Sequence, residues 1–164
     1  MSCMTTGFPH ADAVAAFVRE RRRSSLAKFG ARLRLVRNGA GGMLPLEQVV
    51  DHLGRVAERD LGLQTIALTS IVGTAGRSAC EFDGRFRPTS RRTERRWLSV
   101  ATARRRGRHR WAAAPVRVGE MHFVHDGHHR VSVARAEGDP VIDARVREIR
   151  TRRPATRQLE GLGA

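Results

Sequence analysis

The chain has 164 residues, the length of one domain with short extensions, and it carries 31 Lys and Arg against 16 Asp and Glu, a formal net charge of +15. A field of that sign attracts nucleic acid, nucleotides and other polyanions non-specifically. No apolar run approaches the roughly 18 residues of a membrane span, no signal-peptide pattern opens the chain, and Cys3 and Cys80 form no disulfide framework, so we expect a cytoplasmic protein without a membrane partner.

Residues 1–60 are expected to form a helical N-terminal extension. Apolar residues at helical spacing predict one helix over residues 11–28 and a second helix that begins at Pro45. A glycine-rich break at residues 39–42 separates the two helices. The apolar face of the second helix is expected to consist of Leu46, Val49, Val50, Leu53 and Val56.

Residues 61–150 are expected to form the main domain, of the α+β (α/β-like) class, with a small mixed sheet and flanking helices. The predicted elements, in chain order, are a strand over 63–72, a helix over 92–105, a hairpin of 116–118 with 121–124, a helix over 131–137 and a strand over 142–149. Residues 151–164 are polar and contain Gly and Pro, so we expect a flexible basic tail.

The segment FVHDGHHR, residues 123–130, is the most informative stretch of the chain. A strand pattern stops at Asp126 and Gly127 and continues at helical spacing, and the first N–H groups of such a helix attract an anion. Gly127 lets a phosphate approach the backbone, and Asp126 is placed to cap the helix. Arg130 offers a planar fork that matches phosphate geometry. The alternative is that this Asp-Gly pair is only a turn.

Four histidines cluster around this loop, at positions 122, 125, 128 and 129. Their spacing does not bring them to one face, and no Cys-x-x-Cys or His-Glu-x-x-His motif accompanies them, so we predict no metal site. We expect His128 and His129 to donate to phosphate, and His129 to carry a proton in phosphoryl transfer. The alternative is a structural role for both residues.

At these residues the chain resembles the ParB/sulfiredoxin superfamily, which includes the ParB N-terminal ("ParB-like nuclease") domains. FVHDGHHRVSVARAEG followed by VIDARVREI is similar to the superfamily core, in which a Gly-x-x-Arg phosphate loop joins a strand to a helix. LQTIALTSIVG and GRSACEFDGRFRP extend the resemblance upstream, so that it covers about residues 63–149. It implies phosphate binding by Gly127, Arg130 and Arg77, and His129 matches the sulfiredoxin histidine.

The resemblance also implies a ligand. ParB proteins bind the phosphates of CTP and sulfiredoxins bind those of ATP, so a nucleotide (ATP or CTP) with Mg²⁺ is expected. His128 stands where sulfiredoxins have their cysteine, and sulfiredoxin activity is therefore not expected. Free-serine kinases of the same superfamily resemble the chain as well, which leaves small-molecule phosphotransfer open.

Glu81 and Asp83 supply carboxylates near the predicted loop. On the catalytic interpretation, one of them is the base for an attacking hydroxyl or water, or it holds the Mg²⁺ of a nucleotide. On the alternative interpretation, both form surface ion pairs with neighbouring arginines.

A separate basic cluster is expected to contact nucleic acid weakly. It lies at the end of the predicted 92–105 helix and in the loop after it, where no recognition helix is available to read bases. DNA binding through it would be non-specific and strongly salt-dependent. The cluster consists of Arg104, Arg105, Arg106, Arg108 and Arg110.

Three function classes follow from these observations. The first is a nucleotide- or phosphate-binding domain that uses residues 126–130, with NTP hydrolysis or phosphotransfer as an extension. The second is a DNA-associated ParB-like module (chromosome partitioning or nuclease-like) without catalysis, and the third is a non-catalytic interaction domain. Against full ParB function, we do not expect residues 151–164 to hold a helix-turn-helix and a dimerisation region.

Overall fold

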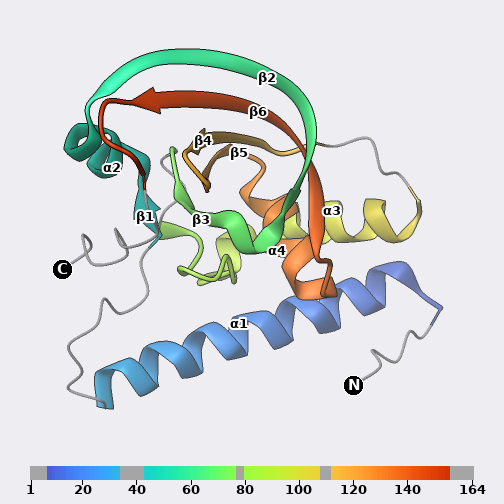
Figure 1. Ribbon diagram of the computed structural model, residues 1–164. Helices are drawn as coiled ribbons and strands as arrows, with labels where there is room; N and C mark the ends of the chain where they lie inside the picture. Colours follow the sequence, from blue (N-terminus) through green and yellow to red (C-terminus); the bar gives the residue numbers. More distant parts are fainter. Residues whose placement is uncertain (1–6, 34–42, 77–79, 108–111, 156–164) are drawn as a thin grey trace.

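The computed structural model describes residues 7–33, 43–76, 80–107 and 112–155 (Figure 1). Within them the chain forms four α-helices and one six-stranded mixed sheet, which confirms the predicted α+β class. None of the described helices is both long and apolar enough to cross a membrane.

The sheet has the strand order β1-β3-β5-β4-β6-β2. The β4–β5 pair and the β2–β6 pair are antiparallel, whereas β1–β3, β3–β5 and β4–β6 are parallel. β2 and β6 form a long curved ribbon at one edge of the sheet (Figure 1). The strands are β1 (Leu44–Pro45), β2 (Arg55–Ala67), β3 (Ile71–Thr74), β4 (Ala114–Val118), β5 (Met121–Asp126) and β6 (Val141–Thr151).

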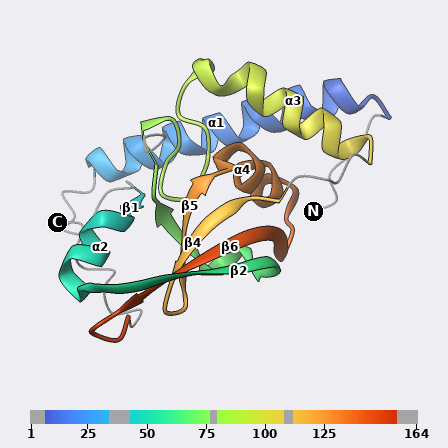
Figure 2. The ribbon, with the colours of Figure 1, turned by 90° about the horizontal axis from the view of Figure 1, so that it is seen from above.

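The helices cover the two faces of the sheet unequally. One core cluster joins α1, α3 and α4 to the sheet, and a smaller one joins α2 to the opposite face. Neighbouring residues of β5 divide between the clusters, Phe123 facing α2 and Val124 facing α4, as strand alternation requires. Figure 2 shows α4 between the sheet and the pair formed by α1 and α3. The helices are α1 (Pro9–Leu33), α2 (Leu46–Leu53), α3 (Glu94–Arg105) and α4 (His128–Glu137).

Most predicted elements are confirmed, with two corrections. The predicted 63–72 strand is two strands, because a short 3-10 turn, Leu68–Ser70, separates β2 from β3. Val56 is not on the face of α2 but lies in β2, 61% exposed, because Gly54 (φ 74°) ends α2. The boundary that the sequence predicts between the N-terminal extension and the main domain, at residue 60, therefore falls inside β2. The two N-terminal helices, α1 and α2, share the core of the main domain. The predicted break at 39–42 and residues 156–164 of the predicted tail lie outside the described residues.

Candidate functional site

The turn between β5 and α4 is built around Gly127. This residue is the N-cap of α4 and has φ 97°, a backbone conformation that side chains disfavour. A Cβ at this position would lie 3.1 Å from Cα of Ala113, so the backbone is packed closely as well. The Gly127 carbonyl accepts the N–H groups of Arg130 (2.8 Å) and Val131 (3.0 Å). The N–H groups of His128 and His129 come earlier in the helix and have no intrahelical acceptor.

Asp126 does not cap α4, which corrects the prediction. It ends β5, where it is paired with Ala114 of β4, and no side chain caps the helix. Its side chain is 64% exposed, and its Oδ2 lies 3.9 Å from a terminal nitrogen of Arg130. The cap position is one residue later because the left-handed turn at Gly127, not a carboxylate, starts the helix.

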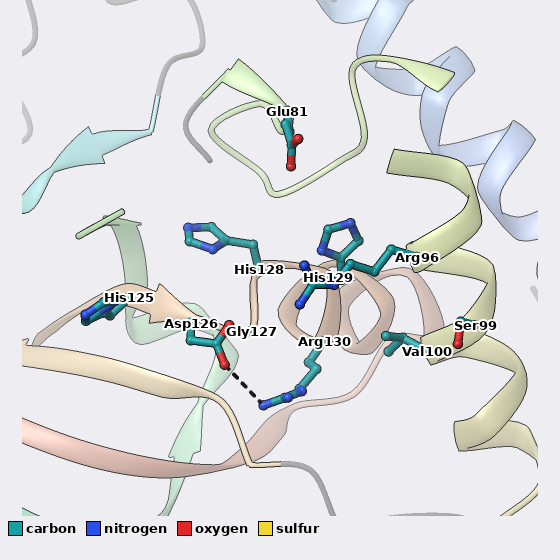
Figure 3. A pocket seen from close by; sticks show the side chains of 10 residues that line it. All are labelled: Glu81, Arg96, Ser99, Val100, His125, Asp126, Gly127, His128, His129 and Arg130. Atoms are coloured by element: carbon teal, nitrogen blue, oxygen red, sulfur yellow. Dashed lines mark ion pairs between the residues drawn. The ribbon is translucent and has the colours of Figure 1, made fainter. Parts of the chain in front are cut away.

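Two arginines from different helices reach this turn. Arg130 of α4 donates a hydrogen bond to the Ala112 carbonyl, which fixes its guanidinium beside Asp126. Arg96 of α3 is exposed and has no ion-pair partner among the residues that the structure describes. α3 is docked on α4 by the buried Trp97, whose indole N–H donates to the Ser132 hydroxyl at 2.9 Å. That contact sets Arg96 next to the N-terminus of α4 (Figure 3).

The arginines, the turn and the loop before α3 enclose a pocket of about 310 Å³. Ligand pockets are roughly 300–1,000 Å³, so this one has room for a phosphate group and a few atoms more. Its walls are formed by Glu81, Arg96, Ser99, Val100, His125, Asp126, Gly127, His128, His129 and Arg130 (Figure 3). Sequence reasoning missed Arg96 and Ser99, which belong to an ordinary-looking arginine-rich helix.

The side chain of His128 is engaged mainly in contacts within the fold and less in the pocket. Its side chain is buried, and its Nε2 lies 2.8 Å from the Thr74 hydroxyl. Its ring stacks against the rings of Phe82 and Phe86, at 6.2 and 5.9 Å between centroids. Burial lowers the pKa of His128 from 6.5 to about 4, so the ring is neutral at pH 7. Because the ring is engaged in these contacts, we assign His128 to positioning the loop of Phe82 and Phe86 instead of binding phosphate with its side chain.

His129, unlike its neighbour His128, has a buried ring nitrogen without a hydrogen-bond partner in the described structure. Its ring meets the Phe82 ring edge-on at 5.0 Å, and its Nε2 is buried with no hydrogen-bond partner among the described residues. Burial, and then the charge of Arg96, lower the pKa of His129 from 6.5 to about 4. The ring is therefore neutral at pH 7 and its free nitrogen is buried, and the proton-carrying role expected for this residue stays a prediction.

The two predicted carboxylates separate in the structure. Glu81 lines the pocket, on the side opposite Asp126 (Figure 3). Asp83 is buried and accepts hydrogen bonds from the backbone N–H groups of Arg85 (3.0 Å) and Arg87 (2.9 Å), and from the Arg87 side chain at 2.9 Å. Asp83 therefore orders its own loop and does not line the pocket. Arg77 lies outside the described residues.

The arginines expected to contact nucleic acid do not share one environment in the structure. Arg104 pairs with Glu137 (Nε to Oε2, 2.7 Å) and with Asp139, and Arg105 pairs with Glu137 at 3.1 Å. These two arginines tie α3 to the end of α4. Arg106 is exposed, and positions 108 and 110 lie outside the described residues.

In the described parts of the chain, no group of three or more His, Cys, Asp or Glu side chains is placed to hold a metal ion. Comparisons of the chain with protein-family models, with curated proteins and with solved structures found no match. The ParB/sulfiredoxin resemblance therefore stays a prediction.

Proposed function

We propose that the pocket at the N-terminus of α4 binds the phosphate group of a ligand, either a nucleotide such as ATP or CTP or another phosphorylated molecule. One observation carries the proposal: Arg96 and Arg130 line one small pocket together with Gly127, His128 and His129, the residues at which α4 begins. Backbone N–H groups, a helix N-terminus and guanidinium groups are the elements with which proteins bind phosphate.

The positive potential of this pocket comes from the arginines and the helix, not from the histidines. His128 and His129 are neutral at pH 7 because burial lowers the pKa of each to about 4. The helix adds roughly half an elementary charge at its N-terminus. Asp126 offsets part of the charge of Arg130, so Arg96 supplies the positive charge that a ligand can pair with most completely.

The size of the pocket limits what enters it. About 310 Å³ accommodates a phosphate with part of a sugar. A nucleotide would therefore bind with its phosphates inside and its base at the mouth. A Mg²⁺ ion that arrives with a nucleotide needs oxygen ligands, and the carboxylates of Glu81 and Asp126 are on the wall to provide them.

NTP hydrolysis or phosphotransfer is an extension of this proposal, and it rests on Glu81 and His129. Both line the pocket and both can accept a proton from a water or a hydroxyl. Replacement of Glu81 by Gln should lower any measured NTP turnover and leave phosphate affinity unchanged or improved, because one negative charge is removed. A turnover rate that is unaffected by Glu81→Gln contradicts a catalytic role for this residue.

Calorimetric titration with inorganic phosphate, ADP, ATP and CTP, each with and without Mg²⁺, tests the binding proposal. Arg96→Ala should weaken binding about tenfold or more, since a charge-assisted hydrogen bond contributes about 1.5–3 kcal/mol. Arg92→Ala is the matched control, because Arg92 is an exposed arginine close to the start of the same helix and does not line the pocket. Equal affinities of the Arg96 and Arg92 variants for every ligand contradict the site.

A further inference from the structure

A second hollow lies on the other side of α3, where α3 runs beside α1. We call this surface the seam; it is lined by His10 of α1 and by residues of α3 between Arg95 and Arg106. The hollow measures about 490 Å³ and has no carboxylate among its lining residues. Arg95 and Arg106 stand at its rim, and both are exposed. Leu98 gives it an apolar wall. The hollow thus combines positive charge with an apolar surface.

The seam and the α4 pocket are joined at one residue. Ser99, which is exposed on α3, lines both hollows. Arg95 and Arg96 occupy successive helical positions, about 100° apart around the axis, so one arginine lies on each side of α3. The surface therefore runs from the seam, over Ser99, into the pocket at the N-terminus of α4 without an intervening acidic side chain on α3.

The charge along this path is not neutralised within the protein. Arg95, Arg96 and Arg106 have no ion-pair partner in the described part of the chain, whereas Arg104 and Arg105 on another side of α3 are paired with acidic residues. Towards the start of α3 the seam continues in a hollow of about 320 Å³ lined by Arg21, Arg22 and Arg91, together with Glu94.

This arrangement fits a strand of nucleic acid. The stretch of chain from Ser99, where the two hollows meet, to Arg106 spans about 10 Å at 1.5 Å per residue, the axial length of about three phosphates of a helical strand. Guanidinium groups bind backbone phosphates, and an apolar wall suits sugars and bases. An acidic peptide would match the charge of the seam, but it would bring no phosphate to the adjoining pocket.

We propose that the phosphate bound by the α4 pocket is the terminal phosphate of a nucleic-acid strand whose backbone lies along the seam of α1 and α3. This inference rests on the function proposed above and names its substrate class. A terminal phosphate monoester carries a charge of about −1.5 to −2, more than an internal diester, and the arginines and N–H groups of the pocket favour the higher charge. A pocket of about 310 Å³ admits the end of a strand, not a phosphate with a nucleotide on either side.

Fluorescence anisotropy with labelled octanucleotides tests the inference. Single-stranded DNA and RNA, and a duplex, are each prepared with a 5′-phosphate, with a 3′-phosphate and with neither. One phosphorylated end should raise the affinity about tenfold over the unphosphorylated strand, and Arg96→Ala should abolish this preference.

A second variant separates the seam from the pocket. Arg95→Ala/Arg106→Ala should weaken the binding of every octanucleotide about tenfold and leave the calorimetric affinity for inorganic phosphate unchanged. Arg150→Ala/Arg152→Ala is the matched control, since it removes the same charge from exposed positions of β6 and the residues after it. The control should change octanucleotide affinity much less.

These experiments distinguish a failure of this inference from a failure of the proposed function. If inorganic phosphate binds with dependence on Arg96 but no phosphorylated end is preferred, this inference is overturned and the proposed function stands. If inorganic phosphate does not bind and a preference for phosphorylated ends survives Arg96→Ala, the pocket assignment is overturned with it. A glutamate-rich peptide that binds the seam as tightly as the phosphorylated octanucleotide would assign the seam to a protein partner and overturn the inference.

Discussion

Replacing Gly127 with alanine tests how closely the β5–α4 turn is built against its surroundings. Two separate effects oppose the substitution. The backbone has φ 97°, and a left-handed conformation costs a residue with a Cβ roughly 1–2 kcal/mol. The new Cβ would also lie 3.1 Å from Cα and 3.2 Å from Cβ of Ala113. Relief of that contact requires the backbone to shift, at a further cost of about 1–3 kcal/mol.

Gly138 provides the matched control for this prediction. It ends the same helix at φ 82°, and a Cβ added there meets no atom within 4 Å. Gly138→Ala should therefore show only the conformational cost, and Gly127→Ala should be less stable by about 1–3 kcal/mol in urea unfolding. Gly127→Ala should also lose affinity for phosphate, because the shift displaces the first N–H groups of α4. Equal destabilisation by the two substitutions would refute the close packing on which the site depends.

Two further predictions concern stability. The pKa values of His122, His128 and His129 are lowered by burial from 6.5 to about 4, so between these pH values the unfolded chain binds protons that the folded chain does not. The free energy of unfolding should therefore fall as the pH falls from 6.5 towards 4, by on the order of 1–2 kcal/mol per histidine after allowance for solvent screening. His128→Asn should flatten this dependence of the free energy of unfolding on pH, as measured by urea unfolding. Arg104→Ala should lower the free energy of unfolding by about 1 kcal/mol, because it removes the ion pairs of Arg104 with Glu137 and Asp139. Arg106→Ala should change the free energy of unfolding by less than about 0.5 kcal/mol. Equal unfolding midpoints of the two variants in urea would contradict that role of Arg104.

The sequence predicts the part of the site that depends on local structure. The strand pattern before Asp126, the glycine and the helical spacing after it lie within a few residues of each other, so the strand–turn–helix unit follows from periodicity and turn preference. The predicted cap, Asp126, is wrong by one residue, because the left-handed turn at Gly127 takes the N-cap position.

The rest of the site depends on contacts between distant segments. Arg96 reaches the pocket because Trp97 bonds to Ser132, 35 residues further along the chain. Similarly, the burial of His128 follows from the packing of Phe82 and Phe86 against its ring. No periodicity in the sequence encodes these pairings, and a helix as rich in arginine as α3 does not reveal which of its charges the fold will neutralise.

Titration of the ¹⁵N-labelled protein with inorganic phosphate tests the central claim most directly, because it follows the backbone N–H groups themselves. We expect the amide resonances of His128 and His129 to shift with phosphate concentration, more than those of residues on α2, and we expect Arg96→Ala to reduce the shift at a given concentration. Amide resonances of His128 and His129 that stay in place while phosphate shifts resonances elsewhere in the protein would contradict the assignment of the anion site to the N-terminus of α4.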